Sequence, residues 1–225
     1  MADPDVSARM RDDWNARARE DAGYYVAFGR RDQDDAEFFA TATQVINNLE
    51  KELKRVPAKE RTHWKALEIG CGPGRLMRPM SRHFAEIHGI DVSDEMIARA
   101  TENLRETPNA FPHVGDGSRL SQFEDASIDF IYSYAVFQHI PSREVIETYV
   151  REVHRLLRPG GLFKFQVQGY LATTSTPDDT WHGVPFSEQQ AREMAERTGF
   201  EMRYSYGAGV QYFWLWYFKQ PAAAL

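Results

Sequence analysis

The stretch Leu67-Glu-Ile-Gly-Cys-Gly-Pro-Gly-Arg-Leu76 places three glycines within five residues, directly after a short apolar run. A helix-like pattern follows at once, so the stretch predicts a strand, a tight turn and the start of a helix. Three glycines are needed there only if the backbone bends sharply or a ligand lies against it. The third glycine follows the second by two residues, whereas the dinucleotide fingerprint that receives a pyrophosphate spaces them by three. We therefore interpret the loop as shaped for a nucleoside-containing ligand without phosphates.

The chain on either side of this loop alternates short apolar runs with helical patterns. Such alternation indicates βαβ units, a parallel sheet and right-handed crossovers. The expected strands cover 64–70, 86–91, 111–115, 128–134 and 162–168, and the expected helices cover 74–85, 93–106 and 143–157. A helix over 188–198 and two strands over 200–206 and 210–218 follow, so an antiparallel hairpin should close the sheet. The last strand is nearly all apolar, which predicts burial on both faces, and the sequence leaves open whether it is an edge or an inner strand.

The N-terminal part of the chain has a different pattern of polar and apolar residues. This pattern predicts helices that cover the sheet. One helix is expected near 5–19, an amphipathic helix over 34–54, and a polar linker after it. We expect residues 1–60 to form a helical lid and residues 61–225 to form the α/β domain. Tyr24 and Tyr25 are the candidate lid contacts, and the alternative is that they anchor the helices to the sheet. A second candidate wall is the loop 169–185, with Tyr170 and Trp181.

Composition narrows the class of protein. The 225 residues are 42% hydrophobic and 27% charged, as expected for a globular chain. The net charge of −6 argues against a nucleic-acid partner held by phosphate contacts. The single cysteine, Cys71, excludes an intrachain disulfide and fits a reducing compartment. No apolar stretch reaches the roughly 20 residues of a membrane helix, and the polar N-terminus is not typical of a signal peptide. We expect a cytoplasmic monomer or homodimer with no membrane partner.

Two carboxylates follow expected strands at the same edge of the sheet. Asp91 ends the second strand, 21 positions after Gly70, where an acid in doubly wound folds accepts hydrogen bonds from both ribose hydroxyls. The alternative is a helix cap, but Ser93 is the better candidate for that role. Asp116 follows the third strand and is placed to accept a proton from an exocyclic amine, with Gly117 and Ser118 offering backbone amides. Its alternative is a plain Asx turn.

Together these motifs resemble those of the class I S-adenosylmethionine-dependent methyltransferases. The resemblance rests on LEIGCGPGRL, GIDVSDEMI, GDGSRL, IDFIYSYAVFQHI and LLRPGGLF, in the order and spacing of that family, over about residues 62–170. It implies a Rossmann-like, doubly wound α/β sheet of seven strands, with an antiparallel last strand. It also implies S-adenosylmethionine as cofactor and S-adenosylhomocysteine as product. The turn at Gly70 to Gly74 would lie by the methionine part, Asp91 would hold the ribose, Met96 would pack by the adenine and Asp116 would read its amine.

The resemblance extends to the side chains around the loop. An acid such as Glu68 often positions the glycine loop or the cofactor amino group, and the alternative is a solvated strand residue. Cys71 is interpreted as a small packing residue rather than a nucleophile. The full set of expected cofactor contacts is Glu68, Gly70, Cys71, Gly72, Gly74, Arg75, Asp91, Val92, Met96, Asp116, Gly117, Ser118 and Tyr134.

Such a site needs little acid, base or nucleophilic catalysis from the protein. A sulfonium methyl is already electrophilic, so placing a nucleophile in line and excluding water can supply most of the rate. A general base is required only if the nucleophile carries a proton, and His139, just beyond the fourth strand, is the candidate. The alternative is that His139 packs against the loop. Phe137 is expected on the acceptor side. No metal-ligand spacing and no acidic cluster for Mg²⁺ is present.

These observations favour transfer of a methyl group to the oxygen, nitrogen or sulfur of a small molecule. The run Tyr134-Ala-Val-Phe137 lacks the Asn/Asp-Pro-Pro-Tyr/Phe motif, which disfavours methylation of adenine or glutamine nitrogen. A protein or nucleic-acid methyltransferase and a non-catalytic cofactor-binding protein remain as alternatives. A nicotinamide dehydrogenase is disfavoured by the glycine spacing. The acceptor cannot be deduced from the fold.

Overall fold

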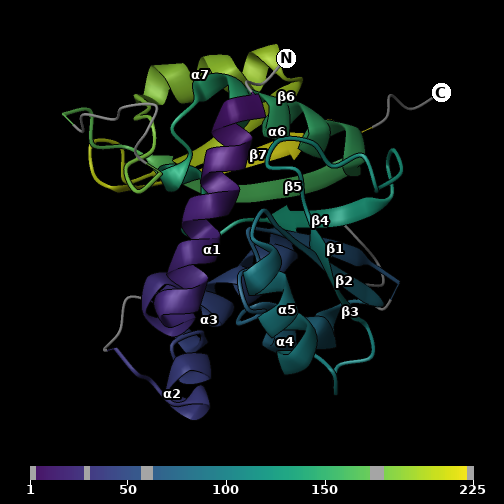
Figure 1. Ribbon diagram of the computed structural model, residues 1–225. Coiled ribbons are helices and arrows are strands. Elements are labelled where there is room, and N and C mark those ends of the chain that lie inside the picture. Colours follow the sequence, from purple (N-terminus) through teal and green to yellow (C-terminus); the bar gives the residue numbers. More distant parts are fainter. Residues whose placement is uncertain (1–3, 28–30, 57–62, 173–179, 222–225) are drawn as a thin grey trace.

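The structure is a computed structural model that describes residues 4–27, 31–56, 63–172 and 180–221. Its centre is a seven-stranded sheet in the order β3-β2-β1-β4-β5-β7-β6 (Figure 1). The first five strands are parallel and β7 is antiparallel to both neighbours. The strands are β1 Lys65–Ile69, β2 Glu86–Asp91, β3 Ala110–Val114, β4 Ile128–Tyr132, β5 Leu157–Gln168, β6 Phe200–Tyr206 and β7 Tyr212–Lys219. The predicted α/β fold with an antiparallel last strand is confirmed, and the order reverses between β1 and β4.

The C-terminal strand is an inner strand, which answers the question that the sequence left open. β7 pairs with β5 from Leu162↔Phe218 to Gln168↔Tyr212, and β6 forms the edge. The prediction that both faces of β7 are buried is correct for one face only. Phe213, Leu215 and Tyr217 are fully buried, whereas Trp214 and Trp216 on the opposite face are partly exposed. The partly exposed face borders a groove that separates it in part from α3.

Helices cover both faces of the sheet. α6 (Arg143–Leu156) and α7 (Glu188–Arg197) pack on one face around Phe163 and Phe165. On the other face, α3 (Thr43–Glu52), α4 (Met77–Met80) and α5 (Asp94–Asn103) pack around Phe130 and Leu162. Ser142 and Ser187 cap the first two helices, the latter in the predicted capping box with Gln190.

Three helical predictions need correction. The helix expected over 74–85 is a single turn at Met77–Met80 followed by a 3₁₀ turn, because the glycine loop continues to Leu76. The helix expected over 34–54 is split into α2 (Asp35–Ala40) and α3 at Thr41, whose hydroxyl accepts a hydrogen bond from Arg75 at 3.0 Å. The helix expected near 5–19 continues as α1 from Pro4 to Ala27.

α1 is kinked and runs along the height of the molecule beside the sheet (Figure 1). The kink lies at Asp21, which has extended dihedral angles inside the helix. The Asp21 carboxylate accepts a hydrogen bond from the Tyr24 amide at 2.9 Å, so it caps the second segment. Arg11 and Asn15 on the first segment bind the β2–α5 loop, through Val92 O and the Asp94 carboxylate. The predicted boundary between residues 60 and 61 lies outside the described residues.

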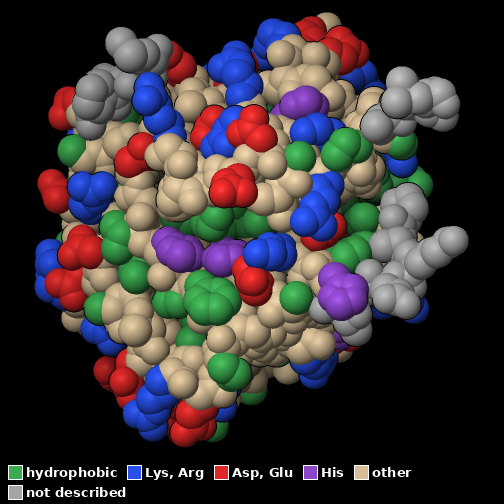
Figure 2. Space-filling model, turned by 90° about the vertical axis from the view of Figure 1, so that its right-hand side faces the viewer, with side chains coloured by type: hydrophobic (Ala, Val, Ile, Leu, Met, Phe, Trp, Pro, Cys, Tyr) green, Lys and Arg blue, Asp and Glu red, His purple; other side chains and the backbone are tan. Residues whose placement is uncertain are grey.

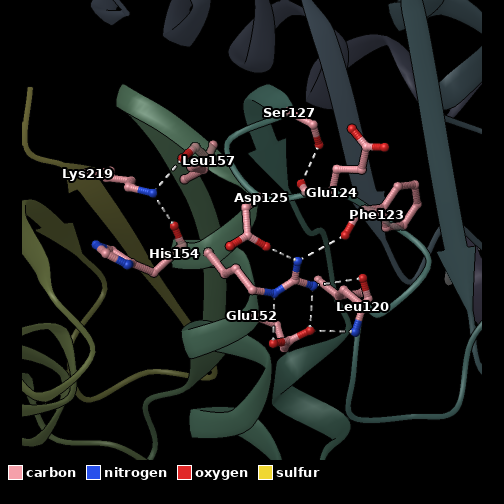
Figure 3. Close-up of polar contacts among 10 residues, drawn as sticks. Leu120, Phe123, Glu124, Asp125, Ser127, Glu152, His154, Leu157 and Lys219 are labelled. Atoms are coloured by element: carbon pink, nitrogen blue, oxygen red, sulfur yellow. Dashed lines mark hydrogen bonds and ion pairs between the residues drawn. The ribbon is translucent and has the colours of Figure 1, made fainter. Parts of the chain in front are cut away.

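The opposite, amino edge of the sheet is held by charged groups (Figure 3). Arg155 near the end of α6 donates hydrogen bonds to the carbonyl oxygens of Leu120 and Phe123 and to the carboxylates of Asp125 and Glu152. Lys219 of β7 donates to the carbonyl oxygens of His154 and Leu157, where α6 ends. These contacts fix the loop that leads into β4.

The surface shows no single dominant charge on the face drawn in Figure 2. Acidic and basic side chains alternate there, with histidines between them, so the described part of this face has no continuous basic patch. Within the described ranges, no helix is long and apolar enough to cross a membrane, and no group of three metal-binding side chains is found.

Candidate active site

The glycine loop joins β1 to α4 and bends because three of its residues are left-handed. Gly70, Gly72 and Gly74 have φ of 71°, 52° and 82°. A Cβ on Gly70 would lie 2.2 Å from Cγ2 of Val136, and one on Gly74 would lie 3.0 Å from Cδ1 of Leu104. The loop therefore needs glycine both for its backbone conformation and for close packing against neighbouring segments.

Asp91 ties this loop to the end of β2. Its Oδ2 accepts a hydrogen bond from the Gly72 amide at 2.9 Å, and its Oδ1 accepts one from the Ser93 amide at 2.9 Å. Burial raises the pKa of the Asp91 carboxyl. Ser93 itself caps α5 through Met96 N, as predicted. Because a carboxylate offers about four lone-pair positions, Asp91 can accept further hydrogen bonds from a ligand diol.

A cavity lies directly above these groups, at the carboxyl edge of β1, β2 and β4. Eight of the predicted site residues line it: Tyr25, Gly70, Gly72, Asp91, Val92, Met96, Tyr134 and His139. The sequence did not point to the other lining residues, which are Met10, Trp14, Val26, Ile69, Ile90, Ala135, Val136, Ile140 and Tyr149. Met10 and Trp14 stand four apart in a polar helix, and this apolar spacing is the signal that identifies the buried face of α1.

Four residues of α1 narrow the cavity to about 80 Å³. Met10 and Trp14 come from the first segment, and Tyr25 and Val26 from the segment beyond the kink at Asp21. Since sites for small molecules and cofactors usually measure about 300–1,000 Å³, these side chains must move before a nucleoside enters.

The turn at Asp116 is not part of the cavity lining. The Asp116 Oδ1 accepts hydrogen bonds from the amides of Ser118 and Arg119 at 2.8 and 2.7 Å, which is the Asx turn that the sequence allowed as the alternative. Gly117 lies against Ser7 of α1. Burial raises the pKa of Tyr149, and the charges of Asp116 and Asp91 raise it further. A Cβ on Gly117 would lie 3.2 Å from Cγ2 of Val92, which lines the cavity, so this turn borders the cavity.

Three predicted contacts are buried and do not line the cavity. Glu68 is buried, not solvated, and its Oε2 accepts a hydrogen bond from the Tyr132 hydroxyl at 3.0 Å. Burial raises the pKa of Glu68 to about 8, so this acid holds its proton at neutral pH. Burial also raises the pKa of Cys71, consistent with a packing role. Arg75 is buried with its guanidinium 5.7 Å from the Tyr134 ring centroid.

His139 lines the cavity with both ring nitrogens engaged. Nδ1 lies 2.7 Å from the Trp181 carbonyl oxygen, and because a carbonyl only accepts, Nδ1 carries the proton. Nε2 then accepts from the Gln138 amide nitrogen at 3.1 Å. The Gln138 oxygen in turn accepts from Gln166 of β5 at 2.9 Å.

The remaining predicted acceptor-side residues divide into two groups. The expectation for Phe137 is wrong: its ring is fully buried in the core against Phe163 and Phe165, because the 3₁₀ turn after β4 points it inward. Tyr170 is largely exposed and outside the cavity lining. Trp181 lies behind the cavity, with its ring centroid 4.9 Å from that of His139 and 6.3 Å from that of Trp14. Tyr24 packs edge-on against Tyr25.

Comparisons with known proteins agree with this geometry. Residues 67–165 match a family model described as a methyltransferase domain. These residues form a class I S-adenosylmethionine-dependent methyltransferase domain. The chain is 35% identical over 97 residues to phosphoethanolamine N-methyltransferase 2 of Caenorhabditis elegans, covering 42% of this chain and 22% of the relative. It is 29% identical over 134 residues to malonyl-[acyl-carrier protein] O-methyltransferase of Enterobacter lignolyticus, covering 59% and 49%. The chain thus spans between a fifth and a half of the length of these curated relatives.

Solved methyltransferase structures share the whole fold. Magnesium protoporphyrin IX methyltransferase of Synechocystis, solved with bound S-adenosylmethionine, superposes with a TM-score of 0.69 at 15% identity. That likeness covers 98% of this chain and 100% of the other. The match includes the segment 4–56 that packs on the methyltransferase domain, in addition to the sheet.

Proposed function

We propose that the chain is a methyltransferase that binds S-adenosylmethionine above the glycine loop and transfers its methyl group to a small molecule. The observation that carries this proposal is the half-buried Asp91 carboxylate, held between the Gly72 and Ser93 amides at the edge where the strand order reverses. Ligands of open α/β sheets bind at such switch points. Asp91 would accept hydrogen bonds from the ribose, Val92 and Met96 would pack on the adenine, and Gly70 and Gly72 would leave room for the methionine part.

The roles of the remaining carboxylates follow from their environments. Asp116 would accept a hydrogen bond from the adenine amine once its turn opens toward the cavity. Glu68, protonated at neutral pH, would support the loop from below through Tyr132 rather than pair with a charged amine.

For this reaction the chain must position the acceptor and exclude water, and it needs acid or base catalysis less. When bound, the cofactor supplies a methyl group whose bond to sulfur breaks as the acceptor lone pair forms the new bond, with the old bonding pair staying on sulfur. Met10, Trp14, Ile140 and Val136 supply an apolar wall that excludes water. His139 would act as a base only after releasing Gln138, so we propose that it mainly fixes Trp181 and the loop after β4.

α1 is the proposed lid, in line with the expectation for residues 1–60. It closes the cavity with side chains from both of its segments, and the kink at Asp21 provides a joint between them. Hydrogen exchange of the described α1 amides should slow when S-adenosylhomocysteine is added. Identical exchange with and without that compound would rule out the lid.

Calorimetry tests the cofactor assignment. We expect S-adenosylmethionine to bind at micromolar level and NAD(H) negligibly. Asp91→Ala should weaken binding by about 1.5–3 kcal/mol, as for hydrogen bonds to a charged group, while Glu106→Ala, at an exposed position outside the cavity lining, serves as an acidic control. Tight NAD(H) binding, or wild-type affinity in the Asp91 variant, would contradict the assignment.

Small molecules are favoured as acceptors over proteins and nucleic acids. One curated relative named above is a phosphoethanolamine N-methyltransferase, whose acceptor is a small molecule, and the overall charge of −6 disfavours nucleic acids. Release of labelled methyl groups to a panel of small acceptors, with bulk RNA and casein as the competing classes, distinguishes these alternatives. Labelling of the macromolecules alone would reject the small-molecule proposal.

A further inference from the structure

A second hollow lies next to the cofactor cavity, on the face of the sheet that α3 covers. It is a groove of about 440 Å³ between α3 and the ends of β5, β6 and β7. Tyr134, which follows β4, lines both the groove and the cofactor cavity. The two spaces therefore share the Tyr134 side chain, which lies between the groove and the cofactor cavity.

Aromatic rings form the walls of this groove. Besides Tyr134, they are Trp214 and Trp216 of β7, Tyr206 of β6 and Tyr212. They share one face of the sheet because Trp214 pairs with Tyr206 and Trp216 pairs with Tyr204 across the β6–β7 ladder. The Tyr134 and Trp214 ring centroids lie 5.7 Å apart. Such a set of ring faces is suited to stacking against a flat, apolar molecule.

The floor of the groove already holds a cation. Lys164 of β5 is buried, with its Nζ 5.0 Å from the Trp214 ring centroid and 4.8 Å from that of Trp216. Its ammonium therefore occupies the position over these rings that a cationic ligand would otherwise take. A ligand with a positive charge would meet Lys164 at close range and be repelled.

The charges around Lys164 leave a local positive excess. Glu52 of α3 binds Lys164 at 3.1 Å through Oε1, and its Oε2 accepts from the Trp216 indole at 2.8 Å and from Arg55 at 2.7 Å. One carboxylate thus faces two cations, and Lys51 at the groove wall adds a third. In a chain with a net charge of −6, this groove is a local site suited to an anion.

We propose that this groove binds the methyl acceptor, and that the acceptor is a planar aromatic compound carrying an anionic group. The inference rests on the proposed methyltransferase function and specifies its substrate class. The aromatic body stacks among Trp214, Tyr206 and Tyr134, its anionic group faces Lys164, and its nucleophilic atom reaches the cofactor cavity past Tyr134. The amide side chains of Gln44 and Asn48 on α3 offer hydrogen bonds to its substituents.

Three probes of matched size test this assignment in the presence of saturating S-adenosylhomocysteine. They are 3,4-dihydroxybenzoate, which is planar and anionic, 3,4-dihydroxybenzylamine, which is planar and cationic, and 3,4-dihydroxycyclohexanecarboxylate, which is anionic but not planar. Titration calorimetry should show 3,4-dihydroxybenzoate binding at least tenfold more tightly than either other probe. Tighter binding of the amine, or equal binding of the cyclohexane acid, would overturn the proposal.

Variants locate the binding in the groove. Trp214→Leu should weaken 3,4-dihydroxybenzoate binding at least tenfold, and Lys164→Met paired with Glu52→Gln should abolish the preference for the anion over the amine. Tyr206→Leu and Tyr204→Leu form a matched pair, because both are exposed aromatic residues on the same face of β6 and only Tyr206 lines the groove. The first should weaken binding about threefold and the second should leave it unchanged, with little risk to the fold.

Cofactor binding, measured in the same samples, separates the two proposals. Retained S-adenosylhomocysteine affinity with equal probe binding in the wild type and in the Tyr206 and Trp214 variants would refute the groove while leaving the methyltransferase function intact. Loss of S-adenosylhomocysteine binding in the wild-type protein would refute the function itself.

Discussion

The two edges of this sheet are stabilised in different ways. At the amino edge, Arg155 and Lys219 hold the loop before β4 and the end of α6 through many charged and carbonyl contacts (Figure 3). At the carboxyl edge, the loop after β1 has left-handed glycines, and the half-buried Asp91 carboxylate at the end of β2 accepts hydrogen bonds from the backbone amides of Gly72 and Ser93. Among the described residues, no ion pair engages Asp91, so its oxygens can accept further hydrogen bonds from a ligand.

This contrast explains why the carboxyl edge can bind a ligand, whereas the amino edge only stabilises the fold. Long charged side chains fill the space between loops at the amino edge and pair with each other there. Glycines and buried acids at the carboxyl edge keep side chains out of the space where a ligand must approach the backbone. The same sheet therefore carries structural contacts at one end and the candidate site at the other.

The largest expected effect comes from adding a methyl group to the glycine loop. In Gly70→Ala the Cβ would lie 2.2 Å from Val136 Cγ2 on a residue with φ of 71°. Overpacking of about 1–3 kcal/mol and a left-handed alanine costing about 1–2 kcal/mol should together lower the free energy of unfolding. Urea denaturation measures this loss.

Gly160→Ala is the matched control, because Gly160 also has a positive φ, of 84°, but has no atom within 4 Å of the added Cβ. This variant should lose only the stability that a left-handed alanine costs, without the loss from overpacking. A Gly70→Ala, Val136→Ala double variant should recover part of the loss. Equal destabilisation by the two single variants would show that close packing does not shape this loop.

The next effect concerns the proton on Glu68. Its pKa is about 8 in the folded chain, against an ordinary value of 4.5, because burial disfavours the charged form. Between these two pH values the folded state holds a proton that the unfolded state has lost. The contribution of Glu68 to stability is thus complete below about pH 4.5 and is lost as the pH rises toward 8, at about 1.4 kcal/mol for each pH unit.

Glu68→Gln cannot titrate, so its stability relative to the wild type should rise along this window. Urea denaturation at pH 5, 6, 7 and 8 gives the difference, with the exposed Glu106→Gln as a control that should not change it. A constant difference between wild type and Glu68→Gln across these pH values would mean that Glu68 is ionised throughout.

Much of this architecture could be predicted because it depends on local pattern. Alternating apolar runs indicated the parallel strands, and the position of Asp91 at the end of β2 followed from the strand that precedes it. The break at Thr41 could not be predicted, because it depends on a contact with Arg75 from a distant segment. The direction of Phe137 was equally hidden, since a 3₁₀ turn of three residues has no periodicity to read.

The site was harder to predict where several elements meet. Met10 and Trp14 enter the cavity only because α1 lies across the sheet, and the sequence does not specify that docking. The aromatic groove depends on the inner position of β7, which places Trp214 and Trp216 opposite α3. Asp116 was identified as a carboxylate after a strand, but whether it faces its own turn or a ligand depends on the loop conformation.

The smallest expected effect tests the amino edge. Arg155→Ala removes donors from two carbonyl oxygens and two carboxylates at once, and its side chain is only 29% exposed. We expect a loss of about 1–2 kcal/mol in the free energy of unfolding. Arg151→Ala, which removes an exposed pair with Glu147 on the same helix, should lose about 0.5 kcal/mol or less. Because these contacts lie at the edge away from the cavity, S-adenosylhomocysteine affinity should stay at the wild-type value in both variants. A change in that affinity for Arg155→Ala would show that the two edges are coupled. It would contradict the view that the amino edge only stabilises the fold while the carboxyl edge binds the ligand.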